Sequence, residues 1–229
     1  MRALRSHRPD KGHGVPRTKA AGGAFRLLGV VAGLFLILVA SEIRAEPLAA
    51  GGFSFSDELG GFTIGRVTGR GTQDDPIVIE KNLTDVEPVI MVIRYDKSSA
   101  VGRVGTGRWI AVHLRLVVRN GSGRVWQGFQ VELQEILHKP SIRQDGLSFD
   151  QGKLVSANVY SNRFSASQRL FEPYDRILFQ DGHVNPADFV DFTMHITDPT
   201  PVKKFYLLLD PQILYSKLLK PAPAERTFG

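Results

Sequence analysis

Apolar and polar residues alternate in short segments throughout the chain after its first 45 residues. The clearest segment is 109–119, where an apolar residue stands at every second position from Ile110 to Val118. Such alternation is typical of a β-strand with one buried face and one solvated face. Segments 125–135 and 189–196 show the same pattern. We therefore expect three strands here, each with one polar side.

The remaining pattern predicts a domain built almost wholly of strands. Glycine, proline, asparagine and aspartate separate the apolar segments, as in all-β proteins. Strands with one apolar face must stack into two sheets or close a barrel to bury that face. We expect an antiparallel β-sandwich, immunoglobulin-like or jelly-roll-like. The further predicted strands are 62–68, 77–80, 89–94, 154–160, 176–180 and 203–209.

A turn signal joins two of the expected strands. Residues 120–123 read Asn-Gly-Ser-Gly, which tolerates the positive φ that a tight hairpin turn requires. The sequence therefore predicts that 109–119 and 125–135 pair as a hairpin.

The chain divides into four parts by pattern. Residues 1–45 form a basic leader with a signal peptide or hydrophobic helix, and 46–52 form a linker. Residues 53–210 form the sandwich, and 211–229 form a short helix and a tail. We expect one folded domain, because this length buries enough apolar surface for folding without cross-links.

The leader predicts export from the cytoplasm. Residues 27–40 are 14 apolar residues behind a basic segment, and Ala45 suits a cleavage site. A helix of that length spans roughly 21 Å, less than the ~30 Å of a bilayer core. We expect a periplasmic or secreted protein. The alternative is an inner-membrane anchor formed by uncleaved residues 27–40, which would be the chain's contact with the membrane.

Charge and cysteine content narrow the classes of partner. The net charge is +6, but 21 of the 29 basic and 21 of the 23 acidic residues follow residue 45. The body is therefore neutral and lacks the positive field that binds phosphate backbones, which argues against nucleic acid as a partner. The chain has no cysteine, which excludes disulfides and thiolate metal sites. We expect no cofactor.

Two polar loops contain most of the candidate binding residues. Long loops at the end of a sandwich often carry recognition. Their acidic residues match neither the spacing of a calcium-binding EF-hand loop nor a catalytic motif, so we assign no metal ligand and no catalytic residue. The candidates from loops 140–150 and 180–188, with one nearby aromatic, are Asp145, Asp150, Asp181, His183, Asp188 and Tyr174.

Histidines and aromatics supply two further clues. His113 and His195 fall on the solvent sides of predicted strands and would form a surface pair if those strands were neighbours. Aromatic residues on a sheet face bind sugars or a partner protein. We place Trp126 in the core. The other aromatics considered are Trp109, Tyr160, Phe164, Tyr174 and Tyr206.

The leading functional hypothesis is an exported, non-catalytic domain that binds a protein or a cell-envelope component through its end loops. One alternative is a metal-dependent or carbohydrate-active hydrolase that uses the acidic loop residues. A second alternative is a structural subunit that assembles by edge-strand addition. The layout is similar to exported bacterial immunoglobulin-like modules, an analogy of fold that carries no function.

Overall fold

The structure is a computed structural model. It describes residues 46–95, 103–104, 107–142, 144–152, 158–169 and 173–213. The predicted leader, most of the predicted strand 154–160 and all but the first three residues of the predicted carboxyl-terminal part lie outside the described residues. The described chain is all-β, apart from the short 3₁₀ helix η1 (Asp150–Gly152).

One sheet, called sheet A, has seven strands, and every neighbouring pair in it is antiparallel. Its order is β1 (Leu48–Ala50), β2 (Phe53–Ser56), β5 (Val89–Tyr95), β15 (Lys204–Gln212), β9 (Gly128–Gln134), β13 (Arg176–Gly182) and β12 (Phe164–Arg169).

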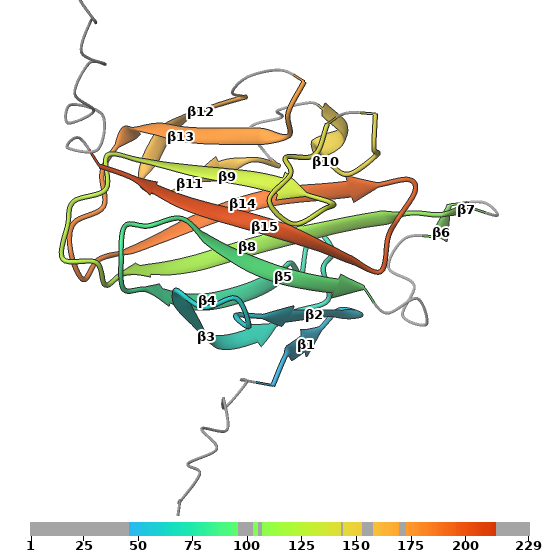
Figure 1. The fold of residues 1–229 in the computed structure, drawn as a ribbon, viewed down its shortest axis with the longest axis horizontal. Coiled ribbons are helices and arrows are strands. Elements are labelled where there is room, and N and C mark those ends of the chain that lie inside the picture. The colour runs from blue at the N-terminus through green and yellow to red at the C-terminus, as the bar shows by residue number, and fades with distance from the viewer. Residues whose placement is uncertain are drawn as a thin grey trace, which may run out of the picture. The chain divides into compact units, whose positions relative to one another are not determined.

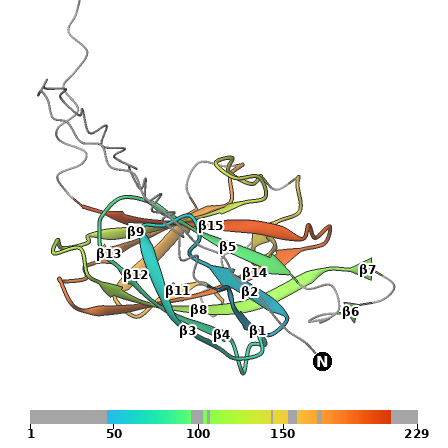
Figure 2. The same ribbon diagram turned by 60° about the horizontal axis from the view of Figure 1, so that its bottom comes forward.

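The other sheet, called sheet B, is mixed. Its order is β10 (Ser148–Phe149), β14 (Phe189–Asp198), β8 (Ile110–Asn120), β4 (Ile77–Leu83) and β3 (Phe62–Thr68), and β11 (Tyr160–Ser161) also pairs with β14. A separate pair, β6 (Arg103–Val104) and β7 (Gly107–Arg108), lies at the right of both ribbon views (Figures 1 and 2).

The expectation of an all-β, two-sheet domain is confirmed, but the expectation of purely antiparallel pairing is wrong in one place. Strands β4 and β8 are parallel. The chain leaves sheet B after β4, forms β5 in sheet A, and returns to sheet B as β8. A parallel neighbour requires such a crossover, because a tight turn joins only antiparallel strands.

The predicted hairpin between segments 109–119 and 125–135 is also wrong. Strand β8 lies in sheet B and β9 in sheet A, so the turn between them carries the chain from one sheet to the other. The Asn120 side chain holds this corner by donating to the carbonyls of Arg124 (2.7 Å) and Val184 (3.0 Å). Trp126 and Val184 exchange backbone hydrogen bonds beside it. These long-range contacts outweigh the local turn signal.

Element bounds differ from the expectations at the ends of the domain and inside it, where β4 extends to Leu83 and the strand β12 was not expected. Strand β3 covers the predicted residues 62–68, and β1 forms within the segment predicted as a linker. Strand β15 continues through Pro211 and Gln212, where a helix was expected to begin. None of the described segments is a helix of sufficient length and apolarity to cross a membrane.

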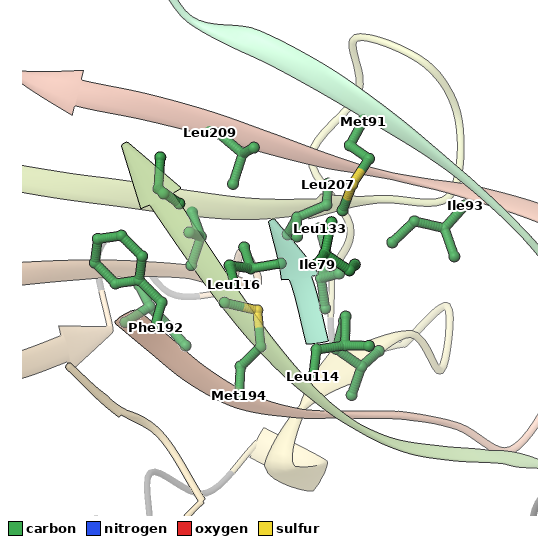
Figure 3. Close-up of a cluster of buried hydrophobic side chains, with 14 of the residues drawn as sticks. Ile79, Met91, Ile93, Leu114, Leu116, Leu133, Phe192, Met194, Leu207 and Leu209 are labelled. Carbon is green, nitrogen blue, oxygen red and sulfur yellow. The ribbon is translucent and has the colours of Figure 1, made fainter. Parts of the chain in front are cut away.

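The two sheets pack their apolar faces together in a sandwich-like arrangement. In Figure 3 the side chains of β5, β9 and β15 point toward those of β4, β8 and β14. Phe129 of sheet A lies 4.4 Å from Phe192 of sheet B, measured between ring centroids. Trp126 is fully buried, as expected, and its indole N–H donates to Ser122 Oγ at 3.0 Å. Each such side chain contributes about 1.5–3 kcal/mol by burial.

One inward-facing residue breaks the apolar pattern of the core. Lys81 on β4 is 4% exposed and points the same way as Ile79 and Leu83. Its ammonium nitrogen lies 3.8 Å from Met91 Sδ and 5.3 Å from the centroid of the Phe62 ring. Burial lowers the pKa of Lys81 from 10.5 to about 7. Among the described residues, the amine therefore has a sulfur atom and an aromatic ring as its partners in the core.

Candidate functional site

The outer face of sheet B is formed by two long neighbouring strands. Strands β8 and β14 are antiparallel and paired over ten positions. Their alternate residues point into the core, and the others point outward. The pairs directly opposite each other on the outer face are Ala111 with Thr197, His113 with His195, Arg115 with Thr193, Val117 with Asp191, and Arg119 with Phe189.

A pocket, called the central pocket, lies over the middle of these strands. Its volume is about 530 Å³, which falls in the range of small-molecule sites. The floor comes from β8 and β14, one wall from the loop between β3 and β4, and the other wall from β11 and the residue after it. The lining residues are Gln73, Pro76, His113, Arg115, Tyr160, Asn162, Asp191 and Thr193.

The first wall is a loop fixed by its own backbone. The carbonyl of Asp75 accepts hydrogen bonds from the N–H groups of Arg70, Gly71 and Thr72. Gly71 has a φ of 84°, a conformation that favours glycine. Its carbonyl accepts the N–H of His113 at 2.9 Å, which ties the loop to β8. This wall is therefore held in place without a ligand.

The second wall presents an exposed aromatic ring. Tyr160 pairs with Thr193 in the sheet and is 48% exposed. Two residues later, Asn162 Oδ1 accepts the N–H of Asp191 at 2.9 Å and anchors this wall to β14. Within the described part of the chain, the side chains of Gln73, Tyr160 and Thr193 make no hydrogen bond. These three polar groups are therefore available to a ligand.

A charged pair crosses the pocket floor. The Arg115 guanidinium donates to Asp191 Oδ2 through Nε at 3.1 Å and also through Nη2. The Arg115 side chain is 48% exposed and that of Asp191 is 19% exposed. The pair holds a planar donor group and a carboxylate acceptor side by side, with near-zero net charge.

One histidine of the pocket floor, His113, stacks on a second histidine, His195. The rings of His113 and His195 are stacked, with centroids 4.2 Å apart and planes 10° from parallel. This is the surface pair that the sequence suggested for neighbouring strands. His195 Nδ1 lies 3.2 Å from Asp150 Oδ1, which also accepts from Asn158 Nδ2 at 2.9 Å. Burial and the nearby His195 lower the pKa of His113, against an opposing effect of Asp150.

The backbone beside the histidines adopts an uncommon conformation. Asp150 and Gln151 have φ values of 47° and 52°, in a region that non-glycine residues rarely occupy. The Gln151 N–H donates to Thr197 Oγ1 at 3.1 Å, which helps to hold η1 against β14. Strain of this kind is often found where a structure positions functional groups. Here it places the Asp150 carboxylate against His195.

The structure separates the six predicted binding residues into two regions at opposite ends of β14. Asp181, His183 and Asp188 precede the first residue of that strand. Asp145 lies at the other end, where its carbonyl accepts from Thr200 Oγ1 at 3.1 Å. The central pocket lies between the two predicted loops.

At the far end of β14, Asp145 is part of a turn. Its carboxylate accepts the N–H groups of Ile142 (3.0 Å) and Leu147 (3.1 Å). Burial raises the pKa of nearby Asp198, and the Asp145 carboxylate adds to this rise. Another of the six predicted residues, Asp150, contacts His195, the histidine that stacks on His113 of the pocket floor.

The other predicted residues lie outside the central pocket. Asp181 is exposed, and its carbonyl accepts from Ser165 Oγ at 3.0 Å. Asp188 lies 4.0 Å from Arg163 in a weak ion pair. Tyr174 lies next to β13 in sheet A, with Arg176 5.9 Å from its ring centroid. In the described part of the chain, no group of three His, Asp or Glu residues is arranged to hold a metal ion.

The sequence pattern indicated which residues face solvent, but it did not indicate which of them lie together on the pocket floor. Alternation correctly assigned His113 and His195 to polar faces, yet it does not specify that β8 and β14 are neighbours. Arg115 was one of several polar residues on its strand, and Gln73 stands in a loop with no motif. The long-range pairing register brings these residues together, and a local pattern contains no such information.

No protein-family model matches the chain, and no curated protein matches it. No solved structure matches it either.

Proposed function

We propose that this protein is an exported, non-catalytic β-sandwich module, immunoglobulin-like or jelly-roll-like, that binds a carbohydrate component of the cell envelope. The proposed site is the central pocket, which lies between the two end loops that the sequence suggested. The observation that carries this proposal is the exposed ring of Tyr160 beside the fixed Arg115–Asp191 pair. Export rests on the pattern of the leader.

The chemistry of the central pocket suits a sugar. A sugar ring has hydroxyl groups that both donate and accept hydrogen bonds, and a C–H face that packs on an aromatic ring. Arg115 supplies donors, Asp191 supplies acceptors, and Gln73 supplies both. Tyr160 supplies the aromatic face.

The pocket is also organised before any ligand binds. The loop of Asp75 is fixed by three backbone hydrogen bonds, and Asn162 ties the second wall to β14. The Arg115–Asp191 pair already holds its planar geometry. Preorganised groups lose little conformational entropy on binding, which favours affinity for a small polar ligand.

One observation favours a hydrolase as a second candidate. The contact of Asp150 with His195 Nδ1 is the arrangement that orients a general base. Nucleophilic catalysis also requires a hydroxyl or thiol within reach of the other ring nitrogen. Within the described residues, no hydroxyl is hydrogen-bonded to either histidine ring. We therefore prefer the binding module to the hydrolase.

The edge-strand alternative finds little support at one described edge. Strand β3 forms an edge of sheet B, and its pairing with β4 contains a bulge between Ile64 and Arg66. Bulges and charged residues at an edge oppose pairing with another chain. Assembly through β3 is therefore disfavoured.

Isothermal titration calorimetry tests the proposal. The purified chain is titrated with linear oligosaccharides of the chitin, cellulose and starch types. We expect at least one type to bind, and Tyr160→Ala to weaken it about tenfold, equivalent to ~1.4 kcal/mol. The matched control is Ile136→Ala, because Ile136 is 60% exposed and lies outside the pocket.

Two outcomes contradict the proposal. One is the absence of binding for every oligosaccharide in the panel. The other is an equal loss of affinity in Tyr160→Ala and Ile136→Ala, which would place the sugar elsewhere. Release of shorter sugars during incubation, abolished by His195→Ala, would replace the binding proposal with the hydrolase.

A further inference from the structure

Two more pockets lie on the outer face of sheet B, one toward each end of β8. The first has a volume of about 400 Å³ and is lined by Trp109, Ser148, Gln151 and Thr197, among others. We call it the Trp109 pocket. The second, the Phe189 pocket, has a volume of about 280 Å³. Together with the central pocket and its Tyr160, each of the three contains one aromatic residue.

The sheet register places the three aromatics at successive levels along the strand direction, on or next to the neighbouring strands β8, β11 and β14, and we call this arrangement the row. Trp109 precedes β8 and continues its outward-facing side, and Phe189 lies opposite Arg119 at the other end. Tyr160 pairs with Thr193, near the middle of the row. Ten residues separate the Trp109 level from the Arg119 level, which corresponds to about 34 Å at ~3.4 Å per residue. This length accommodates several sugar rings in line.

The Trp109 pocket contains an aromatic surface. Trp109 lines it together with Ser148 and Thr197. An indole ring offers a flat face on which a sugar ring can pack. Gln151, an exposed residue of the same pocket, adds a polar group.

The Phe189 pocket offers an aromatic surface with polar neighbours. Phe189, the first residue of β14, is 53% exposed and presents its ring to solvent. Thr63, Glu80 and Arg119 line the same pocket and provide donors and acceptors. The combination resembles the central pocket, where Tyr160 lies beside Arg115.

We infer that the three pockets are subsites for one linear, uncharged glycan chain that lies along β8 and β14. This inference rests on the proposed function and specifies the class of its ligand. The row contains both signs of charge, because Arg115 shares the central pocket with Asp191 and Arg119 shares the Phe189 pocket with Glu80. A polyanion would require a net positive row. A peptide binding by strand addition would require a free sheet edge, whereas these pockets lie on a sheet face.

The test compares affinity across chain length. The disaccharide, tetrasaccharide and hexasaccharide of the type that binds best are titrated into the purified chain by calorimetry. We expect affinity to rise from disaccharide to hexasaccharide by about a hundredfold, because each added subsite contributes an amount on the order of 1.4 kcal/mol. The Trp109→Ala and Phe189→Ala variants should lower hexasaccharide affinity about tenfold more than disaccharide affinity.

The controls separate this inference from the proposed function. Tyr160→Ala should weaken every length, and Ile136→Ala should weaken none. If the sugars bind but affinity is the same for all lengths, or if both end variants bind the hexasaccharide as the wild type does, the three-subsite inference fails while the single-pocket proposal stands. If no length binds, the proposed function fails. Phe189→Ala remains informative if Trp109→Ala does not fold, because Phe189 is largely exposed.

Discussion

The outer faces of the two sheets use similar polar residues in opposite ways. On sheet A, Glu132 is 3% exposed and accepts from Arg176 Nε at 2.6 Å and from Gln134 Nε2 at 2.7 Å. Arg94 and Glu58 form a second close pair there, at 2.6 Å. These groups are largely covered and bind one another.

On sheet B, the polar residues of the outer face remain partly open to solvent. Arg115 and Asp191 are paired, but the guanidinium is half exposed. Gln73 and Tyr160 make no hydrogen bond within the described residues. Polar groups that satisfy one another contribute to stability, whereas polar groups left open around a pocket contribute to binding. Mutations on the two faces should therefore change different properties.

The largest expected effect is on sheet A. Glu132→Ala removes the covered partner of Arg176 and leaves a charge that is only 21% exposed. Removing one partner of a buried ion pair is strongly destabilising. We therefore expect the free energy of unfolding to fall by about 3 kcal/mol. Urea denaturation measures this change. The matched control is Glu80→Ala on the exposed side of β4, which should change stability by less than about 0.5 kcal/mol. Equal losses in the two variants would contradict the comparison.

A slightly smaller change in the free energy of unfolding, of opposite sign, is expected for Lys81 in the core between the two sheets. Within the described part of the chain, Lys81 has neither a charged partner, as Glu132 has, nor the solvent access of Arg115. Lys81→Met replaces the amine with an apolar group of similar length. We expect the free energy of unfolding to rise by about 2 kcal/mol at pH 7, in the range for replacing buried charges by apolar residues.

The pH dependence of stability gives a second readout for Lys81. Its folded-state pKa, about 7, is below the ordinary value of 10.5, so the unfolded chain binds more protons between these values. The contribution of Lys81 to stability therefore increases as pH rises from about 7 toward 10.5. The wild type should gain stability relative to Lys81→Met over this window in urea titrations. A constant difference between the two proteins would show that Lys81 is charged in the core or exposed.

The same residue shows what a sequence pattern could and could not predict. Alternation identified the strand beginning at Ile77, but the predicted strand stopped at Glu80. The structure continues β4 to Leu83 with Lys81 turned inward. Local alternation thus identified most of the long strands and their faces, including those of His113 and His195. It failed where tertiary contacts override local preference.

The candidate site depended even more on information that local patterns lack. The Asn120 turn signal suggested a hairpin, whereas β8 pairs with β14, which is about seventy residues later in the chain. That pairing creates the pocket floor. The carboxylate of the loop residue Asp145 accepts hydrogen bonds from backbone N–H groups of its own turn. Carboxylates in loops often serve turn geometry, so their presence alone does not identify a site.

The smallest expected effect returns to sheet B and its charged pair. Asp191→Asn removes one charge of a pair whose arginine is 48% exposed, and solvent replaces most of the lost interaction. We expect the free energy of unfolding to change by less than about 1 kcal/mol, well below the loss in Glu132→Ala. Sugar affinity should nevertheless fall about tenfold, since Asn keeps one acceptor but loses the carboxylate that positions Arg115. Urea denaturation and calorimetry on the same preparation measure both quantities. A large loss of stability without a loss of affinity would mean that this pair serves the fold, as the pairs of sheet A do, and the distinction between the two faces would no longer hold.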